Sequence, residues 1–310
     1  MAKLMSKKTR EIVQTTTFLV VVALLIIFYV IYPLLTVPDI AARADRERIE
    51  EAEEEYVPDN DASFFTALGL APDTMTVLSN DNIPLASLYF TPDSSRFDSV
   101  RGTVILLHGA DTNRTALSGY VQPLLDSGLT VMIYDQRACG RSGGIYHFGG
   151  DYEGDDLAEV VVRLNFLERL NHPVIAVGFD IGGDAILNAE HEEARIDYGI
   201  AVTPYLTTGN WLTTIRKRDG LLGIPLAGMV YFWWYQKHSG YSYGRTGPDD
   251  ILPLETATLV LVEPDRTESD EVRSLKEKTP DDLLELMPLP ENADNLAPII
   301  LNKIYNKIQQ

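Results

Sequence analysis

The stretch Gly178-Phe179-Asp180-Ile181-Gly182-Gly183 decides how this chain is expected to fold. It follows the short apolar run Val174–Val177 and leads into a helix-like segment near Gly183–Glu193. Glycine stands two residues before and two residues after the central Asp180. Because glycine is used where the backbone turns sharply or approaches another segment closely, the pattern predicts a strand, a tight turn and a helix in succession.

Three further segments follow the same plan, in which an apolar strand ends in a polar or glycine-rich turn. They are Leu106-Leu107-His108-Gly109, the loop Tyr134-Asp135-Gln136-Arg137-Ala138-Cys139-Gly140-Arg141-Ser142-Gly143-Gly144, and Val262-Glu263-Pro264-Asp265. Strand-like and helix-like segments alternate beyond residue 57, which is typical of a parallel sheet covered by helices on both faces.

The expected elements can be given by residue range. The expected strands are Thr74–Leu78, Leu85–Phe90, Thr103–Leu107, Thr130–Tyr134, Val174–Val177, Gly199–Thr203, Thr258–Val262 and Leu283–Met287. Besides the segment after the glycine turn, the expected helices are Arg114–Asp126, Asp155–Leu170, an acidic helix after Val262, and Pro298–Ile308. A long insertion at about residues 204–250 interrupts this alternation.

The order and spacing of the four quoted segments resemble the α/β-hydrolase superfamily, and most of all its membrane-anchored serine hydrolases. The resemblance covers roughly residues 74–310 and implies an α/β-hydrolase fold: a mostly parallel sheet flanked by helices, with residues 204–250 as a lid. It places Asp180 at the nucleophile elbow, where a hydrolytic serine is usual, and an oxyanion turn at His108 and Gly109. It also implies Asp265 as the orienting acid and Asn292 at the position of the catalytic histidine.

The resemblance therefore implies a degenerate catalytic triad. Haloalkane dehalogenases and epoxide hydrolases use an elbow aspartate, but they still need a histidine to activate water. The histidines of the chain are His108, His147, His172, His191 and His238, and all of them precede the last expected strand. Asn292 has no basic nitrogen and cannot accept the proton. A hydrolase that uses Asp180, with His238 reaching down from the lid as base, remains the alternative.

The N-terminal part is predicted to be a membrane anchor. Residues 12–37 contain no charged side chain, and the run Phe18–Tyr32 is apolar throughout. That length suits a bilayer-spanning helix better than the shorter apolar core of a cleaved signal peptide. Basic residues before the span favour a cytoplasmic N-terminus at residues 1–11 and a main domain outside the cytoplasm, periplasmic in a Gram-negative cell. Residues 38–57 are rich in charge and predict a helical stalk.

Composition restricts the classes of function. The chain has 310 residues, with 45 acidic and 26 basic side chains and a net charge of −19, which disfavours nucleic acid as a partner. Cys139 is the single cysteine, so an internal disulfide and a cysteine-rich metal site are excluded. The acidic group Asp151, Asp155 and Asp156 is interpreted as a helix N-terminus, and no cofactor or metal is expected.

Within the expected lid, Leu221–Tyr235 is uncharged and too short to span a bilayer. It ends in five aromatic residues, Tyr231, Phe232, Trp233, Trp234 and Tyr235. A helix that is apolar all round must be buried against something. We expect it to pack on the domain core, and contact with the membrane interface or with a partner protein stays open.

These observations favour a catalytically inactive α/β-hydrolase-like protein with the domain at 58–310. It is expected to be an accessory or structural subunit of a larger integral-membrane complex, held in the lipid bilayer by residues 12–37. Its protein partners are expected to be other membrane proteins. The alternatives are a membrane-anchored hydrolase of the ester, epoxide or haloalkane type that uses Asp180, and a protein that binds a lipid or small ligand in the old pocket.

Overall fold

A computed structural model describes residues 7–27, 31, 61–110, 112–189, 196–218, 226–239, 247–290 and 296–309. The chain divides into two compact units, Met1–Glu47 with Leu212–Ser242, and Arg48–Trp211 with Tyr243–Gln310. The stalk expected at 38–57 and most of the second half of the expected membrane span lie outside the described residues.

The larger unit is built on a sheet of eight strands in the order β1-β2-β4-β3-β5-β6-β7-β8. The strands are β1 Asp73–Leu78, β2 Pro84–Phe90, β3 Thr103–Leu107, β4 Thr130–Tyr134, β5 Val174–Phe179, β6 Tyr198–Val202, β7 Thr258–Val262 and β8 Leu284–Pro288. The pairs β1–β2 and β2–β4 are antiparallel, and the remaining five pairs are parallel. Every expected strand is confirmed to within two residues, and the expectation of a mostly parallel sheet is confirmed as well.

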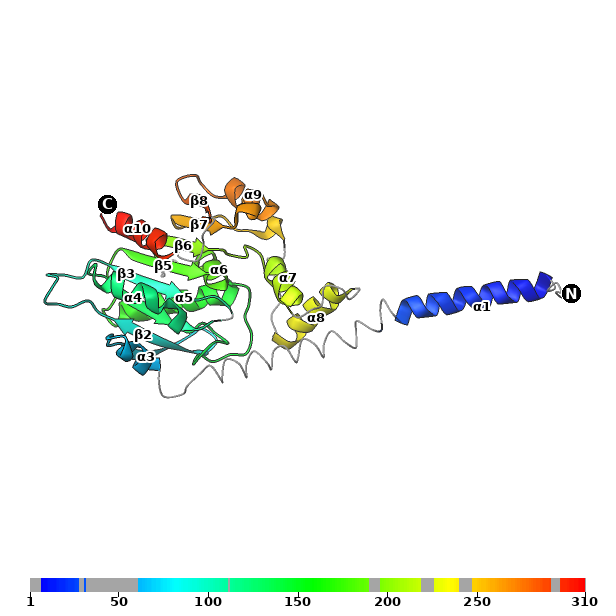
Figure 1. Cartoon of the computed structure of the whole chain (residues 1–310), viewed down its shortest axis with the longest axis horizontal. Helices are drawn as coiled ribbons and strands as arrows, with labels where there is room; N and C mark the ends of the chain where they lie inside the picture. Colours follow the sequence, from blue (N-terminus) through cyan, green and yellow to red (C-terminus); the bar gives the residue numbers. More distant parts are fainter. Residues whose placement is uncertain are drawn as a thin grey trace. The chain divides into compact units, whose positions relative to one another are not determined.

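Helices cover both faces of this sheet (Figure 1). The described helices that lie wholly in this unit are α3 Asp61–Ala67, η2 Arg114–Leu117, α4 Ser118–Leu125, α5 Asp151–Phe166, α6 Ile181–Asn188, η4 Pro248–Asp250, η5 Pro264–Arg266, α9 Asp270–Lys278 and α10 Ala297–Ile308. Residues of α3, α4 and α10 pack on one face, and residues of α5 and α6 pack on the other. Because side chains alternate along a strand, Val104 and Leu106 of β3 join the first core while Ile105 and Leu107 join the second.

The start of α5 differs from the prediction. The sequence predicted a helix from about Asp155, and the helix begins at Asp151. The Glu153 carboxylate accepts the backbone N–H groups of Phe148 at 2.9 Å and Gly150 at 3.0 Å, and so caps the helix one turn earlier. Acidic side chains in this first turn stabilise the positive end of the helix dipole, as the sequence indicated.

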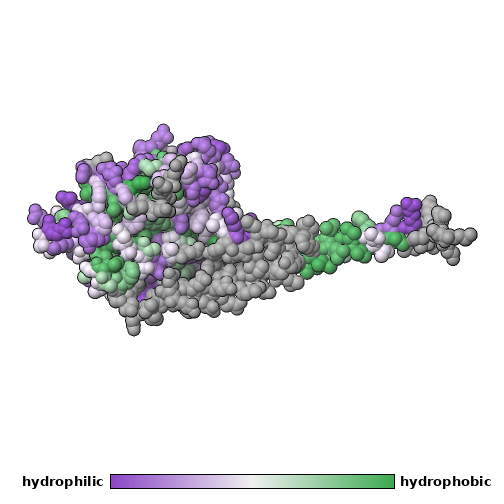
Figure 2. All heavy atoms as spheres, viewed as in Figure 1, coloured by the Kyte–Doolittle hydropathy of each residue, from purple (hydrophilic) through white to green (hydrophobic). Residues whose placement is uncertain are grey.

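In the smaller unit, the described helices are α1 Lys7–Ile26 and α8 Ala227–Ser239. A further helix, α7 Thr208–Arg218, crosses the boundary between the two units. Figure 2 shows an apolar surface along α1, where Phe18, Leu19 and Leu24 are 66%, 60% and 59% exposed. None of the helices in the described ranges is both long and apolar enough to span a bilayer.

Candidate functional site at the end of the fifth strand

Asp180 lies between the last residue of β5 and the first residue of α6, in a backbone conformation that is rare outside glycine. Its φ is 48° and its ψ is −115°. Conformations of this kind cost about 1–3 kcal/mol and persist where the surrounding structure enforces them. The Asp180 N–H donates to Val202 O at 2.9 Å, and the Asp180 carbonyl accepts the Asp184 N–H at 3.1 Å. The turn is therefore held by β6 on one side and by α6 on the other.

The two flanking glycines are required by close backbone approach. A Cβ at Gly178 would overlap the carbonyl group of Gly182. A Cβ at Gly182 would lie 2.8 Å from both His108 O and Leu107 Cβ. The turn after β3 and the turn after β5 thus meet through Gly182, which brings the expected oxyanion turn against the elbow.

The Asp180 carboxylate lies directly over this oxyanion turn. The Thr203 hydroxyl donates to Asp180 Oδ1 at 2.8 Å. A Cβ at Gly109 would lie only 2.5 Å from Asp180 Oδ2, so the carboxylate fills the space above the Gly109 backbone. The family resemblance implies that a hydrolase would bind the negative oxygen of the tetrahedral intermediate at this turn. Here the elbow residue places its own carboxylate there.

His108 is buried and both of its ring nitrogens are engaged. Nδ1 lies 2.7 Å from Gly109 O, and Nε2 accepts the Gln136 N–H at 2.9 Å. Nδ1 therefore carries the proton, and burial lowers the pKa of His108, so that the ring is neutral. The Gln136 amide also donates to His108 O. His108 links the turns after β3 and β4, and it does not act as a base.

The other predicted site residues are not brought to Asp180 within the described part of the chain. Asp265 lies in η5 with an exposed side chain. Asn292, and the side chains of His238 and Trp234, lie outside the described residues. In α8, Tyr231 and Tyr235 are buried, Phe232 is half-buried, and Trp233 is 53% exposed.

The glycine-rich loop after β4 has a structural role, because its Arg137 binds side chains of other segments. Arg137 donates to both oxygens of Asp156 in α5, at 2.8 and 2.6 Å, and reaches Asp81 at 3.1 Å. Its guanidinium carbon lies 5.3 Å from the centroid of the Phe148 ring and 5.0 Å from that of the Tyr152 ring, and the two rings contact each other. Burial raises the pKa of Asp156 to about 6, although Arg137 opposes the rise. Of the acidic side chains at the start of α5, Asp156 therefore binds an arginine. No group of side chains that could hold a metal ion occurs among the described residues.

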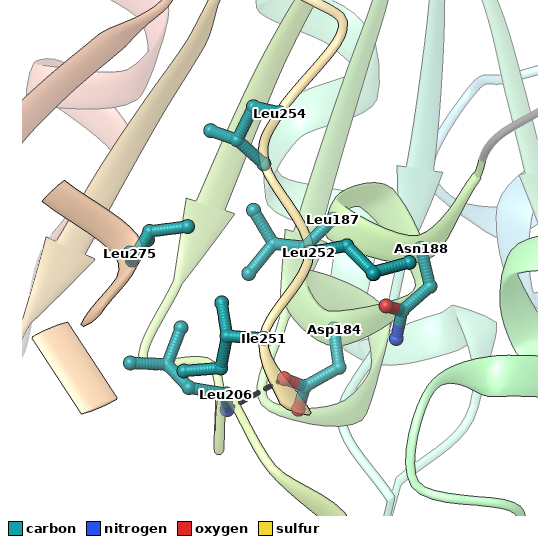
Figure 3. Close-up of a pocket in the computed structure, with 8 residues that line it drawn as sticks. All are labelled: Asp184, Leu187, Asn188, Leu206, Ile251, Leu252, Leu254 and Leu275. Carbon is teal, nitrogen blue, oxygen red and sulfur yellow. Dashed lines mark hydrogen bonds between the residues drawn. The ribbon is translucent and has the colours of Figure 1, made fainter. Parts of the chain in front are cut away.

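Asp184 of α6 is a buried carboxylate beside the elbow that was not predicted from the sequence to be a site residue. Its carboxylate accepts the backbone N–H group of Leu206 at 2.7 Å (Figure 3). It also accepts the backbone N–H group of Tyr205 at 2.9 Å. Burial raises the pKa of Asp184 well above its usual value. Arg266 supports the same loop by donating to the carbonyls of Pro204 and Tyr205 at 3.0 and 3.1 Å. These contacts hold Thr203 and Leu206 at φ values of 50° and 69°.

A cavity of about 20 Å³ lies beside Asp184. Its lining is mostly leucine and isoleucine, as Figure 3 shows: Leu187, Leu206, Ile251, Leu252, Leu254 and Leu275, together with Asn188. That volume holds about one water molecule. An acyl chain does not fit in it.

Comparisons with known proteins agree with the fold described above. The model of the α/β hydrolase family ("Alpha/beta hydrolase family") matches residues 104–299, which is more than half of the chain. The uncharacterized protein YqkD of Bacillus subtilis (strain 168) is 41% identical over 155 residues. That match covers 48% of this chain and 50% of YqkD, so the chain spans about half the length of this curated relative.

Solved esterases share the fold. The Pyrococcus furiosus esterase Pf2001 has a TM-score of 0.56 at 21% identity, with 82% of this chain and 96% of the esterase covered. The Thermogutta terrifontis esterase Est2 has a TM-score of 0.53 at 14% identity, with 76% and 90% covered. Together with the strained turn after β5 and the mostly parallel sheet, the match of the family model shows that this chain belongs to the α/β hydrolase family.

Proposed function

We propose that this chain is a non-hydrolytic member of the family, anchored in a membrane by residues 12–37 and serving as an accessory subunit of a larger membrane assembly. The observation that carries the proposal is the position of the Asp180 carboxylate, which Thr203 holds against the backbone of Gly109. An esterase needs that space for a developing negative charge.

Electrostatics argue against acyl transfer at this turn. Two like charges about 4 Å apart repel by about 4 kcal/mol at an effective dielectric constant of about 20. A single oxyanion-hole donor contributes about 3–4 kcal/mol to catalysis. The Asp180 carboxylate thus offsets what a backbone donor at this turn would contribute to an anionic intermediate.

The described histidines are engaged elsewhere. His108 is saturated by Gly109 and Gln136, and His172 Nδ1 lies 2.6 Å from the Asp197 carboxylate. His147 contacts the side chains of Cys139 and Glu153. Removal of the histidine base from a serine hydrolase lowers kcat by roughly 10⁶-fold in subtilisin. Because none of the histidine side chains described is available as a base at Asp180, the site is expected to bind a ligand rather than to turn over a substrate.

Membrane anchoring is supported by α1. Its exposed residues from Phe18 to Ile26 are all apolar, and such a surface is unstable in water. A role as a subunit is supported by α8, where Met229 and Trp233 are 65% and 53% exposed one helical turn apart. Exposed methionine and tryptophan are typical of contact surfaces. The N-terminus is proposed to be cytoplasmic and the larger unit extracytoplasmic.

One observation favours a second function. Asp180 keeps the strained backbone of a nucleophile elbow, with a φ of 48°, although it is not serine. Retained strain is a reason to suspect chemistry. In this alternative the Asp180 carboxylate attacks an ester, epoxide or haloalkane carbon and forms an ester that water then hydrolyses.

The two functions are separated by assaying the purified full-length chain in detergent with esters, epoxides and haloalkanes. For the non-hydrolytic protein, the wild type and Asp180→Asn show the same background rate. Turnover by the wild type that Asp180→Asn abolishes would refute the proposal and support the second function. Asp282→Asn serves as the matched control, because Asp282 is an exposed carboxylate outside the elbow and has no expected role in a triad.

Anchoring and assembly need their own measurements. Wild type is expected to stay in the membrane fraction after an alkaline wash, and Leu19→Asp to be released. Leu68→Asp, which changes an exposed leucine of the larger unit, is the control. In gentle detergent the wild type is expected to run in a larger assembly that Trp233→Ala weakens and Phe166→Ala does not. A monodisperse monomer of the wild type would contradict the accessory role.

A further inference from the structure

A second group of chemically active side chains lies outside the elbow. The loop after β4 carries Cys139, the segment before α5 carries His147, and the first turn of α5 carries Glu153. Cys139 Sγ lies 3.4 Å from His147 Nε2, and His147 Nδ1 lies 3.3 Å from Glu153 Oε1. A thiol, an imidazole and a carboxylate thus stand in a row, which is the order needed to activate a thiol.

The carboxylate end of this row is fixed. Glu153 is fully buried, and its two oxygens accept the N–H groups of Phe148 and Gly150. Burial raises the pKa of Glu153, but His147, the nearby charge of Arg137 and the Phe148 N–H lower it by more, and the net shift is downward. Glu153 therefore stays ionised and fixes the orientation of the imidazole.

The imidazole in the middle is positively charged at neutral pH. Burial lowers the pKa of His147, but Cys139 and Glu153 outweigh this effect and raise it to about 10. The charged and titratable groups around the row include Arg137, Asp156, Tyr134 and the neutral His108. An imidazolium in contact with a cysteine sulfur stabilises the thiolate, the form of a thiol that reacts with electrophiles.

We propose that Cys139, His147 and Glu153 form a reactive-thiol site for small hydroperoxides. The Cys139 thiolate attacks the terminal oxygen of the hydroperoxide, the S–O bond forms and the O–O bond breaks. The leaving oxygen takes the proton of His147 and departs as water or an alcohol. Cys139 is oxidised to a sulfenic acid, and the hydroperoxide is reduced.

The burial of Cys139 and His147 limits the size of the oxidant that can reach the thiol. Cys139 is only 5% exposed and the His147 side chain 15%, which suits hydrogen peroxide or a small organic hydroperoxide and disfavours bulky electrophiles. Because the chain has one cysteine, the sulfenic acid cannot close an internal disulfide. A small external thiol condenses with it, releasing water and leaving a mixed disulfide. A second thiol then restores Cys139 and leaves as the oxidised small disulfide.

The single cysteine makes the test unambiguous. The full-length chain in detergent is treated with hydrogen peroxide, and a sulfenic-acid-specific probe is followed by mass spectrometry. Cys139→Ser is the blank, and His147→Asn removes the cation. The matched control is His172→Asn, which changes a histidine that pairs with Asp197 and touches no cysteine.

A free thiol is only a few per cent ionised at pH 7, so His147→Asn is expected to slow sulfenic acid formation by roughly 10- to 30-fold. The midpoint of the rate against pH is expected to move up toward about 8.5, where a free cysteine ionises. His172→Asn is expected to change neither. Equal rates and equal midpoints in wild type and His147→Asn, or reaction of the wild type only after unfolding, would overturn the proposal.

A second measurement covers the case in which His147→Asn fails to fold. The ultraviolet absorbance of thiolate is taken as the difference between wild type and Cys139→Ser across the pH range. A thiolate signal already present at about pH 7 supports the site, and a signal that rises only near about pH 8.5 overturns it. Neither measurement depends on Asp180, so this proposal and the proposed function fail separately.

Discussion

Replacement of Gly182 by alanine is the sharpest test of how the elbow is built. A Cβ at this position would lie 2.8 Å from His108 O and 2.8 Å from Leu107 Cβ. Carbon atoms in good contact are about 3.5–4.0 Å apart. Neither neighbour can rotate away, because one is a backbone oxygen of the turn after β3 and the other is the first side-chain atom of Leu107 in β3. The turn after β3 and α6 must therefore separate by several tenths of an ångström.

The expected magnitude follows from two opposing terms. Overpacking of this kind costs about 1–3 kcal/mol, and the upper end applies because two rigid contacts are violated. Alanine in place of glycine inside a helix returns about 1 kcal/mol. We expect Gly182→Ala to lower the free energy of unfolding by about 2 kcal/mol.

The control is Gly119→Ala in α4, where a Cβ would meet no atom within 4 Å. There only the helix term acts, and the free energy of unfolding is expected to rise by up to about 1 kcal/mol. Urea unfolding followed by the fluorescence of the buried Trp211 measures both variants in the same detergent. A Gly182→Ala protein as stable as Gly119→Ala would refute the close approach of the two turns.

Three further perturbations test the rest of the larger unit. Arg137→Leu leaves the buried Asp156 without its partner and is expected to cost about 3–5 kcal/mol in urea unfolding, whereas Arg96→Leu at an exposed pair is expected to cost at most about 1 kcal/mol. Asp184→Asn puts an amide N–H against a backbone N–H and is expected to cost about 1–3 kcal/mol; an unchanged midpoint would contradict the role of Asp184 in holding the loop after β6. The folded-state pKa of His147 is raised to about 10, so its contribution is fully present below about pH 6.5 and is lost as pH rises through about 10. Unfolding free energies at neutral and at alkaline pH are expected to show this loss in the wild type and not in His147→Asn.

Much of the fold could be predicted from the sequence because its signals are local. Apolar runs bounded by turn residues located the strands, and their alternation with helical segments indicated the parallel sheet. The glycines around Asp180 predicted a tight turn whose physical reason, close backbone approach at Gly178 and Gly182, is visible in the structure. The start of α5 was misplaced by four residues, because Glu153 caps the helix through backbone groups that no periodicity reveals.

Only part of the candidate site could be predicted from the sequence. The sequence indicated that Asp180 replaces the usual serine and that no histidine follows the last strand. It did not indicate that the Asp180 carboxylate would accept a hydrogen bond from Thr203 and lie over Gly109. Both contacts depend on how the turns after β6 and β3 pack against the elbow. Asp184 was not predicted for a similar reason, because its hydrogen-bond partners are backbone N–H groups of a loop distant in the sequence.

The order of strands and helices, the strained turn and the apolar N-terminal run could all be predicted, because each follows from residues close together in the chain. Which polar side chains meet depends on how the chain packs in three dimensions. Cys139, His147 and Glu153 belong to a loop, a connecting segment and a helix, and nothing in their spacing predicts a row. The direction of a side chain in a loop is set by packing against distant segments, and that information exists only in the folded chain.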